Sequence, residues 1–163
     1  MKSVLFALLL GLALPAWAQD VAVETPAAGT VPEQDAPAPV EGLLILDAAG
    51  IDPDSFLWEL RIVAVMADSP NDPAFQQQMR EIEDRPGDLF DRDVVVLVDS
   101  DRASNSLLRQ RLRPRGFMLA IIDKDGEIKQ RRPAPRDVRE ISAIIDRFPL
   151  RRQEMLERRP SGR

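Results

Sequence analysis

The stretch from Phe117 to Arg131 constrains the fold more than any other. An apolar segment, Met118 to Ile122, is followed by the charged turn Asp123-Lys124-Asp125-Gly126 and then by a polar segment. Asp-Gly between two extended segments indicates a β-hairpin, because a type I′ turn needs positive φ. The unbroken apolar arm predicts a strand covered on both faces, and the polar arm predicts an edge strand. We expect Lys124 and Lys129 to interact primarily with the turn and the edge strand rather than with a ligand.

Two buried strands and an intervening helix are predicted ahead of the hairpin. Leu60 to Ala67 and Asp93 to Val98 are nearly continuous apolar runs. Between them, Asp72 is a suitable N-cap and Pro73 a suitable first helical residue. Arg85-Pro86-Gly87 should stop that helix. Gly42 to Asp47 is a lead-in that is either a strand or a turn. Phe56-Leu57-Trp58 should pack on the flank, with Trp58 in the core or at its rim.

Two further helices complete the pattern. Asp99-Ser100-Asp101 is expected to cap a short helix that carries Leu107, Leu108 and Leu112 and is broken by Pro114 and Gly116. After the hairpin, apolar residues from Val138 to Phe148 recur at helical spacing, and Pro149 should end that helix. If the tail continues as helix, Glu154 and Arg158 are spaced for an i,i+4 ion pair. The order β-α-β-α-β-β-α predicts an α/β, thioredoxin-like fold, with a mixed sheet and helices on both faces.

The N-terminal part is not expected to belong to this domain. Residues 1–18 combine a basic start, an apolar segment and the small-x-small motif Ala16-Trp17-Ala18, which together predict a signal peptide cleaved near Ala18-Gln19. An uncleaved anchor is the alternative, although the apolar segment is short for a membrane span. Residues 19–41, with five acids and no base, predict a disordered Pro/Ala-rich linker. The folded domain is then 42–155, followed by a charged tail, 156–163, in a periplasmic or secreted protein without a stable membrane span.

The chain contains no cysteine and no histidine. Without cysteine, thiol–disulfide oxidoreductase and peroxiredoxin chemistry, structural disulfides and cysteine-ligated zinc are excluded. Without histidine, the usual general base near neutral pH and the commonest transition-metal ligand are missing. The composition therefore predicts a redox-inactive domain, and no cofactor is expected.

Charge is distributed unevenly along the chain. Residues 1–101 carry a net charge of −14 and residues 102–163 a net charge of +9. The basic part favours an anionic surface or an acidic protein as partner, or else a solvated surface that pairs with the acidic half. Nucleic acid is not expected, because the protein should be exported and has few aromatic residues for base stacking. The arginines of this possible basic face are Arg109, Arg111, Arg113, Arg115, Arg131, Arg132, Arg151, Arg152, Arg158 and Arg159.

The loop after the first buried strand is the first candidate site, because ligands of open α/β sheets gather at the carboxyl ends of strands. Redox-active thioredoxins carry Cys-x-x-Cys there, whereas this chain has Asp68 to Pro73. Asp68 and Asp72 could bind a hard cation or act as a general acid or base. The commoner role of Asp72 is to cap the helix, which would leave Asp68 a solvated loop residue.

Two arginines beside the buried strands are further candidates. Arg61 and Arg92 could bind a carboxylate or phosphate, or they could pair with acids such as Asp47, Asp91 or Asp123. The second interpretation is favoured, because half-buried charges are usually paired. The candidate binding residues are therefore Asp68, Asp72, Arg61, Arg92, Lys124, Arg151 and Arg152.

Several motifs together resemble one family. They are Trp58-x-x-Arg61, Asp91-Arg92-Asp93, Asp123-Lys124-Asp125-Gly126 with Lys129, and above all the stretch from Ile145 to Met155, IDRFPLRRQEM. The chain resembles the P-DUDES domain, the thioredoxin-like domain of unknown function 4174, over roughly Trp58 to Met155. The resemblance implies a thioredoxin-like fold and an exported protein, since the family occurs in exported bacterial and animal extracellular-matrix proteins.

Two functions are compatible with these observations. The first is a non-redox binding or interaction module in the periplasm, which is favoured because a thioredoxin-like pattern is present without redox residues. The second is a non-redox enzyme that uses Asp68, Asp72 or Asp123 with arginine support. A carboxyl group with a perturbed pKa inside a cleft would favour the enzyme.

Overall fold

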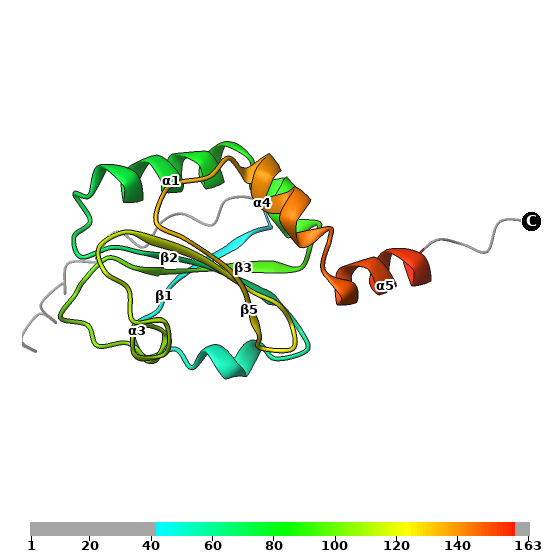
Figure 1. The fold of residues 1–163 in the computed structure, drawn as a ribbon, viewed down its shortest axis with the longest axis horizontal. Coiled ribbons are helices and arrows are strands. Elements are labelled where there is room, and N and C mark those ends of the chain that lie inside the picture. Colours follow the sequence, from blue (N-terminus) through cyan, green and yellow to red (C-terminus); the bar gives the residue numbers. More distant parts are fainter. Residues whose placement is uncertain (1–41, 159–163) are drawn as a thin grey trace, which may run out of the picture. The chain divides into compact units, whose positions relative to one another are not determined.

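The computed structural model describes residues 42–158, which are built around one five-stranded sheet (Figure 1). In the sheet the strand order is β1-β3-β2-β4-β5. The first three of these are parallel, and β4 is antiparallel to both β2 and β5. The predicted mixed sheet is confirmed, and the lead-in is a strand at its edge. The strands are β1 (Leu44–Asp47), β2 (Arg61–Met66), β3 (Val94–Asp99), β4 (Met118–Ile122) and β5 (Ile128–Arg132).

Helices cover both faces of the sheet, as the sequence predicts (Figure 1). On one face lie α1 (Pro73–Asp84), α2 (Pro86–Phe90) and α4 (Val138–Ile145). On the other lie the 3₁₀ helix η1 (Pro53–Phe56) and α3 (Leu107–Leu112). The central strand β2 is buried along its whole length, so its alternate side chains enter two different cores: Val63 and Val65 pack toward α1 and α4, and Ile62 and Met66 toward α3.

The hairpin is confirmed, but its predicted turn type is wrong. Only Gly126 has positive φ, +78°, within the turn. Its N–H donates to the carbonyl oxygen of Asp123, and the N–H of Asp123 donates to that of Glu127. This pattern is typical of a type I turn followed by a left-handed glycine, the usual three-residue hairpin loop. As predicted, β4 is buried and β5 is an edge strand that carries Lys129, Arg131 and Arg132.

The predicted stop of α1 is confirmed, but the predicted cap of α3 and the predicted end of α4 are wrong. Ser106 caps α3 by accepting a hydrogen bond from the N–H of Arg109, and Asp99-Ser100-Asp101 does not cap it. Pro86 stops α1 but also begins α2. α4 ends at Ile145, before Pro149, and Pro149 instead begins another helix, α5 (Pro149–Arg158), which extends past the end of the sheet (Figure 1). Proline is well suited to a first helical turn, because its missing N–H has no intrahelical partner there.

Trp58 does not lie in the core. Its side chain is mostly exposed, with a relative accessibility of 69%, and its backbone is left-handed, with φ +67°. A hydrogen bond from its N–H to the carbonyl oxygen of Lys124 holds this conformation at 2.7 Å. The expected leader (1–18) and linker (19–41) lie outside the described residues. None of the helices in residues 42–158 is long and apolar enough to cross a membrane.

Candidate functional site

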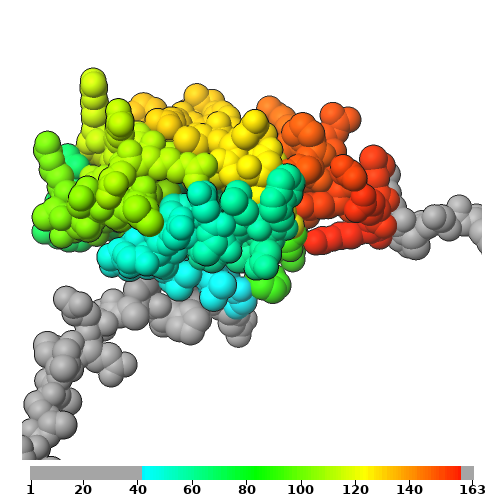
Figure 2. All heavy atoms as spheres, turned by 90° about the horizontal axis from the view of Figure 1, so that it is seen from below, coloured from blue at the N-terminus to red at the C-terminus, as the bar shows by residue number. Residues whose placement is uncertain are grey.

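Charged side chains gather at two opposite ends of the sheet. One group lies where β2 and β3 end, and the other where these strands begin. Six residues of β2 separate the two groups by roughly 20 Å at the usual rise of a strand. In Figure 2 the segment around α3, in green, lies at one end of this view and α5, in red, at the other. We call them the loop end and the helix end.

A buried ion pair organises the loop end. Asp99, the last residue of β3, is 3% exposed. Arg109 of α3 donates from Nη2 to Asp99 Oδ1 at 2.7 Å and to the carbonyl oxygen of Ala67 at 2.6 Å. Its Nη1 lies 3.4 Å from Asp68 Oδ1, and the Ser106 hydroxyl donates to Asp99. Arg109 thus joins the ends of β2 and β3.

The protonation of this pair follows from its contacts. Burial by itself raises the pKa of Asp99, but hydrogen bonds from Arg109 and Ser106 outweigh burial and lower that pKa below its usual value. The hydrogen bond to Asp99 in turn raises the pKa of Arg109. Both groups are therefore charged, and Asp99 neutralises most of the charge of Arg109. We infer that Arg109 supports the loops.

Further arginines line a hollow of about 530 Å³ beside this pair. The strand register explains why these residues lie together. Met66 at the end of β2 lies opposite Met118 at the start of β4. The segment before β4 therefore runs beside the loop after β2. The hollow therefore brings together residues that are distant in sequence. Its charged lining residues are Asp68, Arg102, Arg109, Arg113 and Arg115.

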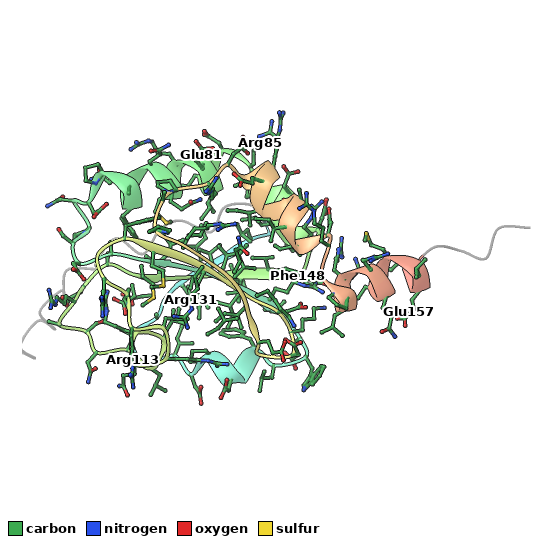
Figure 3. All side chains as sticks on the ribbon, in the orientation of Figure 1. Glu81, Arg85, Arg113, Arg131, Phe148 and Glu157 are labelled. Atoms are coloured by element: carbon green, nitrogen blue, oxygen red, sulfur yellow. The ribbon has the colours of Figure 1, made fainter. Side chains whose placement is uncertain are left out.

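The end of α3 places two of these arginines on a turn. Arg113 is the C-cap of α3 in a left-handed conformation, with φ 49°, and donates its N–H to the carbonyl oxygen of Arg109. Pro114 cannot continue the helix, and Gly116, with φ +71°, directs the chain into β4. Arg113 and Arg115 are exposed on this turn. Figure 3 shows Arg113 pointing away from the domain.

A second hollow, of about 250 Å³, continues from the first. It shares Arg113 and Arg115 and adds Phe117, Met118 and Pro133, together with Arg131 and Arg132 at the end of β5. Its lining is therefore partly apolar and partly basic. We call the two hollows together the arginine groove.

The arginines of this groove differ in how fully they are paired. Arg102 is 80% exposed, and its contact with Asp68 is long, at 3.8 Å. Arg113, Arg115 and Arg132 form no ion pair with any residue of the described range 42–158. The groove therefore presents positive charge that this part of the chain does not neutralise.

The helix end is built around Arg61, the first residue of β2, which is completely buried. Its Nε donates to Asp123 Oδ1 at 2.8 Å, and its Nη2 to Glu154 Oε1 of α5 at 2.9 Å. Nη1 donates to the carbonyl oxygen of Arg92 at 3.0 Å. Lys124 contacts both Glu154, at 3.1 Å, and Asp93, at 2.9 Å. All the basic groups named here are paired.

The same network fastens α5 to the domain. Arg92 forms a bidentate pair with Asp146, with Nη2–Oδ2 at 2.8 Å, and Arg151 contacts Asp146 and Glu154. Arg151 is the one buried residue within the described part of α5. Arg158 pairs with Asp93 at 3.1 Å, not with Glu154 as the i,i+4 spacing suggested. Charge, more than apolar burial, holds α5 in place.

The carboxyl groups of this network have depressed pKa values. Burial raises the pKa of Glu154, but the hydrogen bonds and charges of Arg61 and Lys124 lower it to about 2. Burial also raises the pKa of Asp146, but Arg92 and Arg151 lower it below its usual value. Asp123 is fully buried, and its Oδ2 has no hydrogen-bond partner among the described atoms.

The structure divides the seven candidate residues between the two ends. Arg61, Arg92, Lys124 and Arg151 meet at the helix end, where the ion-paired interpretation of Arg61 and Arg92 is supported. Asp123, one of the acids expected as partners, pairs with Arg61, but the partner of Arg92 is Asp146, which was not among them. Arg152 is exposed and forms no ion pair within residues 42–158. The remaining two candidates, Asp68 and Asp72, lie at the loop end.

The aspartates proposed for catalysis do not meet. Asp72 caps α1 by accepting hydrogen bonds from the N–H groups of Ala74 and Phe75, at 2.8 and 3.1 Å. Asp68 pairs with Arg109, and Asp123 lies at the opposite end of the sheet. Within the described part of the chain, no three acidic side chains are grouped to hold a metal ion. The geometry therefore does not favour an acid–base enzyme.

Three partners of these arginines were not recognised from the sequence. The sequence pattern predicts a helix cap for Asp99 and an ion pair within its own helix for Glu154. Asp146 stood in the stretch that carries the family resemblance but was given no role. The signal available for Asp146 and Glu154 was their place in this Arg-rich stretch, Ile145 to Met155.

Comparisons with known proteins agree with this fold. Chloroplastic thioredoxin z is 19% identical, with a TM-score of 0.50, covering 63% of this chain and 91% of that one. Thioredoxin f from spinach chloroplast is 14% identical (TM-score 0.49; 64% and 92% covered), and thioredoxin peroxidase I of Plasmodium yoelii is 13% identical (TM-score 0.48; 69% and 84% covered). At 19% identity the likeness to thioredoxin z shows the thioredoxin-like fold alone.

No curated protein sequence matches the chain. A family model does match, over residues 52–154, which is more than half of the chain. The matched region contains β2 to β5 and the residues Arg61, Arg92, Asp123 and Glu154 of the helix end. The chain therefore belongs to the family described as domain of unknown function DUF4174.

Proposed function

We propose that this chain is an exported, non-redox module with a thioredoxin-like fold that binds an anionic partner through the arginine groove. The observation that carries the proposal is that several arginines gathered in one groove lack a carboxylate partner within residues 42–158, whereas the buried cations of the helix end are paired. At the helix end the buried or half-buried cations, such as Arg61 and Lys124, meet carboxylates. At the loop end Arg113, Arg115 and Arg132 meet none within residues 42–158.

The position of the groove supports a binding role. Ligands of open α/β sheets bind outside the carboxyl ends of the strands, and the groove borders the ends of β2 and β3. The loop that follows β2, Asp68 to Pro73, contains no thiol, and neither does the rest of the chain. A thiolate mechanism is therefore unavailable at this place.

Export is part of the proposal and rests on the sequence. Residues 1–18 have the three regions of a signal peptide, and the chain carries no cysteine that an oxidising compartment would alter. A basic groove outside the cytoplasm would meet acidic proteins and anionic surfaces more often than nucleic acid. The partner is accordingly a protein or surface that presents negative charge.

Site-specific photo-crosslinking in the exporting cell tests this proposal. A photo-reactive amino acid replaces Pro133 at the edge of the groove in one protein, and Arg147, on the exposed surface near α5, in another. We expect discrete adducts from the Pro133 position that disappear when Arg113 and Arg115 are both changed to glutamate.

The position at Arg147 serves as the matched control, because that residue is exposed and lies at the other end of the domain. Equal adducts from the two positions would contradict the proposal. Adducts that persist after both arginines are reversed in charge would also contradict it, because the groove would then contribute nothing to binding.

A further inference from the structure

We infer that the arginine groove receives an extended acidic peptide segment of a partner protein. This inference rests on the proposed function and names the chemistry of the partner. The groove has the elongated form that such a segment requires, because two hollows share Arg113 and Arg115 between them. It therefore runs from the loop after β2 to the end of β5.

The arrangement of the cations favours several separate carboxylates over one small anion. A compact anion such as phosphate is bound by several N–H donors that point at the same place. Arg109 is the least exposed arginine of the first hollow, but its guanidinium already donates to Asp99 and Asp68. Of the other cations, Arg102 is exposed on the loop after β3, and Arg113 and Arg115 are exposed on the turn after α3. Each could form one exposed ion pair with a different acidic residue.

The second hollow adds a requirement for apolar contact. Phe117 is 7% exposed, and with Met118 and Pro133 it provides apolar lining between Arg115 and Arg132. A flat anionic membrane surface cannot enter a hollow of this kind, whereas an extended peptide can insert alternate side chains. We therefore expect the peptide to alternate acidic and apolar residues.

Fluorescence anisotropy with the purified full-length protein tests the inference. The probe is a short labelled peptide of alternating glutamate and valine, and a glutamine–valine peptide is its uncharged control. We expect the acidic peptide to bind and the uncharged one not to bind. Changing Arg113 to asparagine, which tolerates the left-handed conformation, and Arg115 to glutamine should weaken binding about tenfold, the sum expected of two exposed ion pairs.

The matched control removes the same charge elsewhere. Arg147→Gln with Arg152→Gln changes two exposed arginines at the helix end that form no ion pair within residues 42–158. This variant should bind the peptide with an affinity within about twofold of that of the original protein at the same salt concentration. Equal weakening in the two double variants overturns the inference, because binding would then follow net charge alone.

A second measurement separates this inference from the proposed function. Sedimentation with vesicles of phosphatidylglycerol and phosphatidylcholine tests an anionic lipid surface. If the vesicles bind through Arg113 and Arg115 and the acidic peptide does not, the peptide inference is overturned while an anionic partner stands. If neither the peptide nor the vesicles bind and the photo-crosslinks are absent, the proposed function fails as well.

Discussion

At the scale of single residues, Arg61 shows how this domain tolerates a buried charge. The guanidinium is fully buried, and its donors reach Asp123, Glu154 and a backbone carbonyl oxygen. A buried ion pair is a weak source of net stability, because desolvation offsets much of the attraction. Removing one partner is costly, however, because the other charge remains buried without compensation.

We therefore expect Arg61→Met to lower the free energy of unfolding by ~3–5 kcal/mol, since it leaves the fully buried Asp123 unpaired. Urea unfolding followed by circular dichroism measures the change. Arg85→Met is the control, because Arg85 is 41% exposed and pairs with Asp88 at 3.3 Å, so its loss should cost less than ~1 kcal/mol. Similar losses in the two variants would contradict the role given to Arg61.

At the scale of elements, α5 is unusual in what attaches it. A surface helix normally buries an apolar stripe. Here Arg151, Glu154 and Arg158 contact the domain, while Leu156 is 67% exposed. The attachment should therefore respond to the protonation of Glu154. Its folded pKa is about 2, below the usual 4.5, so its stabilising contribution is present above about pH 4.5 and is lost as the pH falls toward 2.

We expect Glu154→Gln to reduce the free energy of unfolding near neutral pH by ~2 kcal/mol, less than the full pKa shift implies because the side chain is 20% exposed. The difference from the original protein should shrink as the pH falls from about 4.5 to about 2. Urea titrations across this range measure it. Glu157→Gln, which changes an exposed residue of the same helix, should show no such trend; a pH-independent effect of Glu154→Gln would contradict the assignment.

The elements also show where sequence reasoning succeeds and where it stops. The hairpin, β2 and β3 follow from apolar runs and turn residues close in sequence, and they were predicted to within one or two residues. The cap of α3 was missed because a loop, residues 100–105, separates Asp99 from the true cap, Ser106, and Asp99 pairs instead with Arg109. The contacts of Glu154 were missed because Arg61 is 93 residues away, and spacing within a helix cannot reveal such a pair. Exposure of Trp58 depends on a backbone hydrogen bond to the hairpin turn, which no local pattern indicates.

At the scale of the whole molecule, the uneven charge of the sequence is only partly neutralised by folding. Arg109, Lys124 and Arg158 from the basic part pair with Asp68, Asp99 and Asp93 from the acidic part. For these residues, the basic part of the chain is neutralised by the acidic part, which was the alternative to an anionic partner. That alternative does not hold for Arg113, Arg115 and Arg132 of the arginine groove, which form no ion pair within residues 42–158.

The proposed location can be tested independently of any partner. Residues 1–41 fused to an alkaline phosphatase without its own leader should yield active enzyme in a Gram-negative host, because the enzyme becomes active only after export. A fusion that begins at residue 19 is the control and should stay inactive. Inactivity of both fusions, with both proteins present in the cell, would contradict export.

The exposed position of Trp58 has a practical consequence for spectroscopy. The chain has two tryptophans and no tyrosine, and the other tryptophan, Trp17, lies within the expected leader. In a protein without residues 1–18, near-ultraviolet emission therefore comes from one ring that already faces solvent in the native state. Its wavelength should change little on denaturation, so it would be a poor monitor of global unfolding. Quenching of this ring would instead report on whatever approaches the turn that it shares with Lys124.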